Sequence, residues 1–153
     1  MKIIHLTTIL IITMIGITPP ATGQKCHDFH KSNICALQGK DGFKLSTLSR
    51  SHYLGVGKTI TYEVVLYGQK DIIIQCCTEE KYYPVRFKLK SALNGDVIYD
   101  NIYDNYINSI QLALDRTELI LIEITIDPKD TALQGTKACL GMAIYMEKTE
   151  LRQ

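Results

Sequence analysis

The stretch VRFKLK at residues 85–90 alternates strictly between apolar and basic side chains. A period of two is typical of a β-strand with one buried and one exposed face. In this register Val85, Phe87 and Leu89 share the apolar face, and the three basic side chains point to solvent. We therefore expect a strand here, with Phe87 turned into the core.

The same period, or a short continuous apolar run, recurs along most of the chain after residue 42. The runs are rich in Ile, Val, Tyr and Thr, and Gly, Asn, Asp or Pro separates them, as in the strong turn signal Asn94-Gly95-Asp96. No segment shows convincing helical amphipathicity. The expected strands are residues 43–48, 59–66, 71–77, 85–90, 97–100, 110–114, 118–127 and 138–147.

About eight strands at this spacing must cover their apolar faces, and two packed sheets do so at this length. The sequence therefore predicts an all-β fold: an antiparallel two-sheet β-sandwich, jelly-roll-like, in residues 42–153. The length of 153 residues, with 46% hydrophobic and 22% charged residues, fits one such domain with short appendages.

The first 23 residues have the layout of a secretory signal peptide. Lys2 precedes an apolar run at residues 3–17, and two prolines follow it. Ala21 and Gly23 are the small residues that a cut after Gly23 requires. We therefore expect residues 1–23 to be removed and the protein to be exported, to the periplasm or the extracellular space. The run is shorter than the ~20 apolar residues that span a bilayer, so no transmembrane segment is expected after cleavage.

The charge balance argues against a nucleic-acid partner. The chain has 17 basic and 16 acidic side chains, and loss of Lys2 with the signal leaves 16 of each. A nucleic-acid-binding protein would need a basic stripe to neutralise phosphates. A neutral domain must hold any partner through local contacts. No cofactor is expected.

Export exposes the cysteines to an oxidising compartment, where thiols pair. All five lie after the expected cut, at Cys26, Cys35, Cys76, Cys77 and Cys139. We expect Cys26 to pair with Cys35 and to staple a polar N-terminal arm at residues 24–41. The second expected pair is Cys76 with Cys139, which leaves Cys77 as the odd thiol. Cys77 is equally eligible as the partner of Cys139, because adjacent residues on a strand point to opposite faces.

A metal site is the alternative interpretation of the arm. Cys26, His27, His30 and Cys35 offer two sulfurs and two imidazoles within ten residues. Their spacing is not a usual zinc pattern, and oxidation competes for both thiols. We therefore expect a disulfide and no metal.

The most unusual local sequence repeats Ile-Tyr-Asp-Asn twice in succession at residues 98–105. Its tyrosine rings could stack on a sugar or contact a peptide while Asp and Asn bind polar groups. Calcium is less suited, because the stretch lacks the glycine and the closely alternating acids of a calcium loop. A polar connection with Asx turns is the simpler alternative. The candidate binding residues are Tyr99, Asp100, Asn101, Tyr103, Asp104, Asn105 and Tyr106.

Candidate catalytic groups are few. Outside the arm only His52 could act as a general base, and no third group is implied that would orient it toward Ser49 or Ser51. The sequence therefore favours a non-enzymatic binding or structural component of the cell envelope. Its partner would be a glycan, or a protein or peptide, of the envelope. The alternative is an envelope hydrolase that uses His52 with a nearby carboxylate.

Several segments carry a resemblance to known proteins. They are Gly68-Gln69, the strand that ends at Cys76, residues 87–89, 97–101 and 119–128, and Ala138-Cys139-Leu140-Gly141-Met142. In this order the chain resembles a family of small exported proteins of Gram-negative bacteria that has no assigned function. It is similar, more distantly, to the bacterial pre-peptidase C-terminal domain, a jelly-roll module of secreted proteases. That similarity implies a non-catalytic binding or stabilising module. The chain departs from it in the extra Cys77 and in holding no protease domain within these residues.

Overall fold

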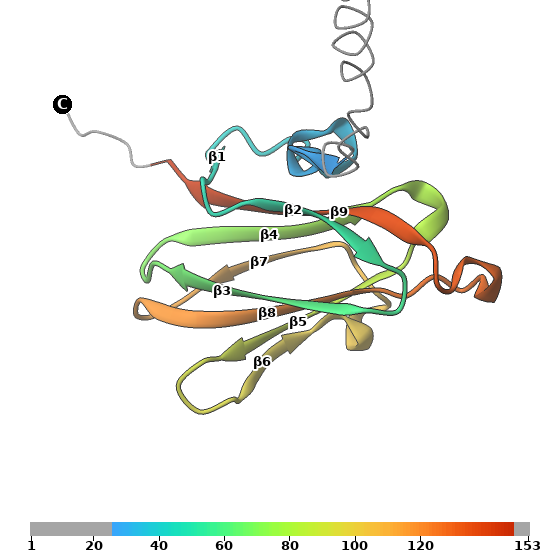
Figure 1. Cartoon of the computed structure of the whole chain (residues 1–153). Coiled ribbons are helices and arrows are strands. Elements are labelled where there is room, and N and C mark those ends of the chain that lie inside the picture. Colours follow the sequence, from blue (N-terminus) through green and yellow to red (C-terminus); the bar gives the residue numbers. More distant parts are fainter. Residues whose placement is uncertain (1–25, 149–153) are drawn as a thin grey trace, which may run out of the picture.

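The computed structural model describes residues 26–148, which form two antiparallel sheets packed face to face (Figure 1). The strands are β1 (Phe43–Leu45), β2 (Arg50–Gly55), β3 (Thr59–Leu66), β4 (Asp71–Thr78), β5 (Val85–Ser91), β6 (Val97–Asp100), β7 (Ser109–Ala113), β8 (Glu118–Ile126) and β9 (Lys137–Glu147). Short 3₁₀ turns are η2 (Phe29–Lys31), η3 (Asn33–Cys35), η4 (Glu80–Tyr82), η5 (Asn101–Asp104) and η6 (Thr131–Leu133). The expected all-β sandwich is confirmed.

The strand order is that of a jelly roll. One sheet runs β2-β9-β4-β7, with β1 pairing the distal part of β9, and the other runs β3-β8-β5-β6. From β2 onward, strands that are neighbours in the first sheet are distant in sequence. Two Greek keys, the basis of a jelly roll, have this property. Connections at one end of the sandwich join β2 to β3, β4 to β5, β6 to β7 and β8 to β9.

All eight expected strands are present, and a ninth was missed. The expected strand at residues 43–48 ends at Leu45, and a connection leads to β2. Sequence periodicity does not show β2, because its apolar residues Tyr53 and Leu54 are adjacent and do not alternate. It is a strand because it pairs along its whole length with β9, from Arg50 opposite Met142 to Gly55 opposite Lys137.

The core lies between the sheets. Val85, Phe87 and Leu89 are 1%, 0% and 1% exposed, so the inward face expected for this strand is confirmed. Phe87 is opposite Ile124 and Leu89 is opposite Ile122 on β8. The alternate isoleucines of β8 and the inward side chains of β4 and β9 complete the layer. Its largest fully buried members are Phe87, Leu66, Ile72, Ile74, Leu89, Ile120, Ile122, Ile124, Ile126, Leu140, Met142 and Ile144.

The disulfide pairing differs from the expected one. Cys26 is bonded to Cys139 and Cys35 to Cys77, and Cys76 is the buried free thiol. The expected Cys26–Cys35 and Cys76–Cys139 pairs are therefore wrong. The physical reason is the alternation along β4: Cys76 points into the core, whereas Cys77 points to the outer face, where the arm lies. Proximity in sequence did not decide the pairing, because the arm crosses the sheet and does not close on itself.

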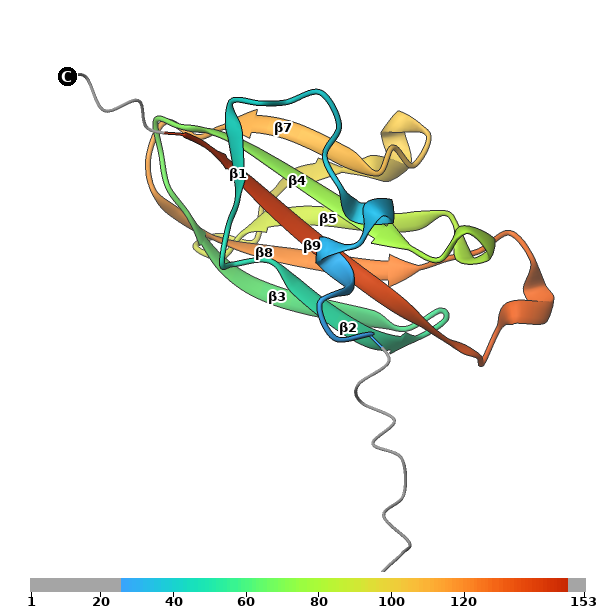
Figure 2. The same cartoon turned by 90° about the horizontal axis from the view of Figure 1, so that it is seen from above.

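The arm is fixed over one row of cross-strand neighbours. Gly141 on β9 lies opposite Ser51 on β2 and opposite Cys77 on β4. A Cβ on Gly141 would lie 2.6 Å from the sulfurs of Cys35 and Cys77 and 3.0 Å from the Cα of His30. Glycine at this position therefore makes the room in which η2 and η3 cross β9, as seen from above in Figure 2.

The expected signal peptide at residues 1–23 and its cut after Gly23 lie outside the described residues. Within residues 26–148, no helix has the length and apolar character needed to cross a membrane.

Candidate functional site

Asp100, the first aspartate of the repeated sequence, belongs to an ion-pair cluster on the outer face of the four-stranded sheet. Its side chain is 4% exposed and lies 2.8 Å from Nη2 of Arg86 and 3.3 Å from Nζ of Lys88. It also accepts the N–H of Ile102 and so caps η5. Burial acts to raise the pKa of Asp100, but the hydrogen bonds from Arg86, Ile102 and Lys88 outweigh it, and the pKa lies below its usual value. This carboxylate stabilises the loop and has no free surface for a ligand.

Asn101 is a buried structural amide. Its Oδ1 accepts the backbone N–H of Phe87 at 2.9 Å. Its Nδ2 donates to the carbonyl oxygens of Val85 and Ile107, both at 2.9 Å. With 0% exposure the side chain reaches no ligand, so the expectation that Asn101 forms part of a binding surface is corrected.

Tyr99 also faces inward. Its ring packs on Phe87, with centroids 5.6 Å apart. Of the other candidates, Tyr103 is 86% exposed, Asp104 and Asn105 are exposed, and Tyr106 is half-buried. The expected platform of three tyrosines is thus reduced to one fully exposed ring. Ligand binding by Tyr103 to Tyr106 stays a prediction.

His52 is exposed on β2, and its side chain makes no hydrogen bond or ion pair with any residue in the range 26–148. A hydrolase site would need a carboxylate to orient this imidazole and a nucleophile beside it. The structure brings neither to His52, so nothing favours the hydrolase alternative.

The four possible metal ligands of the arm do not form a site. Cys26 and Cys35 are in two different disulfides, so neither sulfur is a thiolate. Nδ1 of His30 is hydrogen-bonded to Ser51, and His27 pairs with Asp28. Across the described part of the chain, no three His, Cys, Asp or Glu side chains gather closely enough to hold a metal ion.

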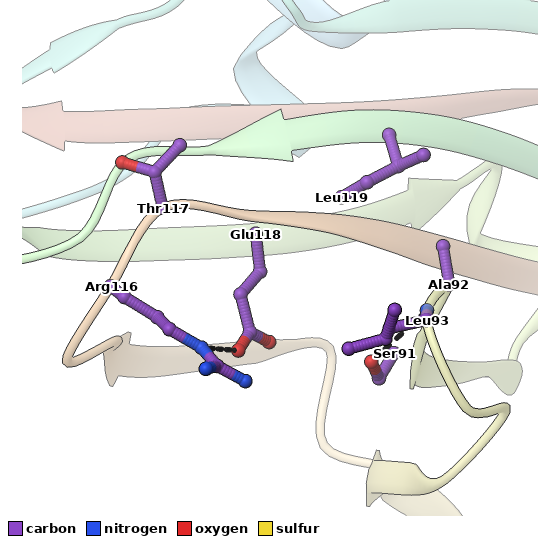
Figure 3. A pocket seen from close by; sticks show the side chains of 7 residues that line it. All are labelled: Ser91, Ala92, Leu93, Arg116, Thr117, Glu118 and Leu119. Atoms are coloured by element: carbon purple, nitrogen blue, oxygen red, sulfur yellow. Dashed lines mark hydrogen bonds and ion pairs between the residues drawn. The ribbon is translucent and has the colours of Figure 1, made fainter.

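A surface hollow lies at the opposite end of the sandwich from Tyr103. An open hollow of about 530 Å³ is lined by Ser91, Ala92, Leu93, Arg116, Thr117, Glu118 and Leu119 (Figure 3). Leu93 is 84% exposed and Leu119 is 43% exposed. Val65, which is 45% exposed, is opposite Leu119 on the neighbouring strand β3. We call Val65, Ala92, Leu93 and Leu119 the apolar corner.

The hairpin that carries Leu93 is held by its own hydrogen bonds. The N–H of Gly95 donates to the carbonyl of Ser91 at 2.9 Å, and the N–H of Ser91 donates to the carbonyl of Asp96 at 2.9 Å. Oδ1 of Asn94 accepts the N–H of Asp96 at 3.1 Å. Gly95 has a φ of +77°, which glycine adopts without strain. The turn therefore presents the leucine side chain in a defined place.

The lining of the hollow includes an ion pair between Arg116, on the β7–β8 turn, and Glu118, at the start of β8. Nε of Arg116 donates to Oε1 of Glu118 at 2.7 Å, as Figure 3 shows between the labelled side chains. The neighbouring β3–β4 turn packs against this turn, because Gly68 donates its N–H to Thr117 at 3.1 Å and a Cβ on Gly68 would overlap the Arg116 backbone. The lining thus combines the apolar side chains of Ala92, Leu93 and Leu119 with two hydroxyls and one oppositely charged pair, whose formal charges cancel.

Several other side chains on the outer face of the four-stranded sheet are polar and paired, although Val97 and Ile98 on β6 are 54% and 44% exposed. Besides the Asp100 cluster, Nζ of Lys90 lies 2.6 Å from Oε1 of Glu123. The hydroxyls of Thr59 and Thr125 are 2.7 Å apart. The apolar corner contrasts with these paired polar side chains, because Val65, Leu93 and Leu119 within it are all exposed.

Comparison with known proteins gives one likeness to a solved structure and no family. No known protein family matches the sequence, and no curated protein matches it either. Among solved structures, the chain is similar to the periplasmic lysozyme inhibitor of g-type lysozyme from Aeromonas hydrophila. The two share 16% sequence identity, with a TM-score of 0.48, over 65% of this chain and 84% of the other. At this degree of likeness, what the Aeromonas protein inhibits carries no argument about this chain.

Proposed function

We propose that the protein is an exported, non-enzymatic binding protein that docks onto a folded protein of the cell envelope through the apolar corner. The observation that carries the proposal is the exposure of Leu93 and Leu119 beside a hollow of about 530 Å³ with a paired arginine and glutamate in its lining. Exposed apolar side chains gathered at one place and rimmed by polar groups mark interaction sites on soluble proteins.

The chemistry of the hollow suits a protein better than a glycan. Sugar recognition relies on aromatic rings beside hydrogen-bonding groups, and none of the seven lining residues is aromatic. An aliphatic side chain of a protein partner fits between Leu93 and Leu119, and its backbone or polar groups can bind Arg116 and Glu118. A few desolvated anchors of this kind supply most of the affinity of protein interfaces.

The fixed hairpin supports the same assignment. Ordering a flexible loop on binding costs affinity, and a turn that already holds its bound shape avoids that cost. The turn from Ser91 to Asp96 is closed by two backbone hydrogen bonds and one from the Asn94 side chain. Leu93 is therefore exposed on a rigid element and not on a loose one.

Export is supported by the cysteines. Two disulfides lie within the described residues, and disulfides persist in oxidising compartments outside the cytosol. Together with the signal peptide expected at residues 1–23, they support a place in the periplasm or the extracellular space.

Photo-crosslinking in the envelope tests the proposal. A benzophenone amino acid is placed at Leu93 in one variant and at Tyr103, the most exposed ring of the other end, in a second. We expect a discrete protein adduct from position 93 and none from position 103. Leu119→Asp should suppress the adduct, while the matched change Ile107→Asp, at a side chain that is 45% exposed in the connection between η5 and β7 at the other end of the sandwich, should not.

An adduct from position 103 alone, or no adduct from position 93, would contradict the proposal. A glycan array with the wild-type protein then asks whether a sugar is the ligand instead. A purified g-type lysozyme can be added in the photo-crosslinking experiment as one protein probe.

A further inference from the structure

The ion pair beside the apolar corner has a third charged neighbour. Arg116 and Glu118 line the hollow beside Leu93, and they also line a second open hollow of about 480 Å³. Asp115 is the third charged residue in the lining of this second hollow. It is exposed and makes no ion pair within residues 26–148. The two adjoining hollows therefore hold two carboxylates and one cation.

Two further carboxylates lie on the rim of the apolar corner. Glu63 is exposed on β3, one row along the outer face from the corner. Asp96 is exposed in the hairpin that carries Leu93. On the neighbouring strand β5, the cation Lys90 is used in an ion pair with Glu123. The charges around the corner therefore favour a cationic group over an anionic one.

The carboxylate of Glu118 has room for a second donor. A carboxylate accepts up to about four hydrogen bonds, and within the described residues this one accepts a single bond, from Nε of Arg116 to Oε1 (Figure 3). The Arg116 side chain is 75% exposed and that of Glu118 is 24% exposed. Because an ion pair with such an exposed partner contributes little to stability, Arg116 can turn into solvent at little cost while Glu118 stays in the hollow.

Lysine and arginine side chains match this combination of walls and charge. Each has an apolar stem that packs along hydrophobic surface and a charged head that binds carboxylates. We infer that the group which enters the hollow is a lysine or arginine side chain of the partner protein. Its stem packs between Leu93 and Leu119, and its head binds Glu118 with Asp115 close by. This inference rests on the proposed function and names the chemistry that the partner presents to the apolar corner.

An uncharged aliphatic side chain suits the hollow less well. It packs on Leu93 and Leu119 as the stem of lysine does, but it brings no donor to Glu118. It also removes water from that carboxylate, and a polar group that loses water without gaining a partner costs free energy. The charged head therefore distinguishes the inferred occupant from a plain apolar one.

Small probes test this difference without a partner protein. Amide NMR signals of the labelled protein are followed while N-acetyl-lysine methylamide is added, up to about 100 mM at constant ionic strength. The matched probe is N-acetyl-norleucine methylamide, which has the same apolar stem without the charge. We expect the lysine probe to shift the signals of Leu93 and Leu119 with a dissociation constant of about 10–100 mM. The norleucine probe should bind at least about threefold more weakly.

Three variants assign the charge that selects the lysine probe. Glu118→Gln should weaken binding of the lysine probe about two- to fivefold, because the carboxylate that binds the head is lost. Arg116→Gln should strengthen it by a similar factor, since a competing cation is removed. Glu80→Gln is the matched control, because it makes the same change in η4 at the other end of the sandwich. Circular dichroism and the thermal midpoint show that each variant is folded.

Equal binding of the two probes would overturn the inference, as would a lysine probe that Glu118→Gln leaves as strongly bound as before. Signals of Leu93 and Leu119 that stay unchanged up to the highest concentration would also overturn it. In each of these cases a protein adduct from position 93 would still support the proposed function. Absence of that adduct, with the lysine probe bound at the hollow, would instead contradict docking of a folded protein and support the hollow as a site for a cationic side chain.

Discussion

Nδ1 of His30 lies 2.7 Å from the hydroxyl oxygen of Ser51, and the backbone N–H of the same histidine donates to that oxygen at 2.9 Å. The serine hydroxyl has one proton and two acceptor lone pairs, so with the backbone N–H bound it can either donate to an unprotonated Nδ1 or accept from a protonated one. This pair attaches the arm to β2 on one side of Gly141, and the Cys35–Cys77 disulfide attaches it to β4 on the other.

The His30 contact predicts a stability that depends on pH. Burial lowers the pKa of His30 below its usual value of 6.5. The unfolded chain therefore takes up this proton at a higher pH than the folded chain does. The contribution of neutral His30 to the free energy of unfolding is therefore complete well above pH 6.5 and is lost as the pH falls below 6.5.

Thermal midpoints between about pH 8 and pH 5.5 measure this loss. His30→Gln should flatten the dependence, while His27→Gln, at a side chain that is 79% exposed, should leave it unchanged. An equal slope in both variants would contradict the assignment.

Gly141→Ala is expected to destabilise the fold by about 1–3 kcal/mol, because the added methyl group meets both sulfurs of the Cys35–Cys77 disulfide. Gly42→Ala is the matched control, since nothing lies within 4 Å of its Cβ position. Urea unfolding of the two variants compares their stabilities. Equal stabilities would show that the arm does not cross β9 where the structure places it.

The disulfide map is a separate prediction. Peptide mapping without reductant should join Cys26 to Cys139 and Cys35 to Cys77. Cys76 should react with a thiol reagent only after unfolding, because it is fully buried and burial raises the pKa of its thiol. Finding Cys26 joined to Cys35 would restore the pairing expected from proximity.

Most of the fold follows from side-chain periodicity. The alternation at residues 85–90 predicts a strand whose inward face the structure confirms, and the turn at Asn94-Gly95-Asp96 lies where expected. β2 could not be found this way, because it is an edge strand whose pairing with β9, and not its own pattern, makes it a strand. The cysteine pairs depend on the path of the arm across the sheet, which no local pattern encodes.

The site is less predictable than the fold. The repeated Ile-Tyr-Asp-Asn sequence drew attention to polar residues, yet Asp100 and Asn101 are used inside the protein to fix a loop. The apolar corner leaves a weaker signal: Leu93 is a leucine beside a turn, where a polar residue is usual. Leu119 lies near Leu93 only because the β5–β6 and β7–β8 connections, which are distant in sequence, are brought together by the fold.

Asn101→Ala should cost about 2–4 kcal/mol, because three backbone groups lose their partner, two of them in buried hydrogen bonds. Tyr103→Ala, at an 86% exposed ring, should change stability by less than about 0.5 kcal/mol. Chemical unfolding of both variants separates the structural part of the repeat from its exposed part. A large cost at Tyr103 would show that its ring packs against the protein.

The claim that the apolar corner is the binding surface is tested most directly by NMR. The partner captured at position 93 is purified and added to isotope-labelled protein, and the backbone amide signals are followed. We predict that Val65, Ala92, Leu93 and Leu119 shift or broaden, while Tyr103, Asp104 and Asn105 do not. Changes confined to residues 103–105, with the corner unaffected, would contradict the account.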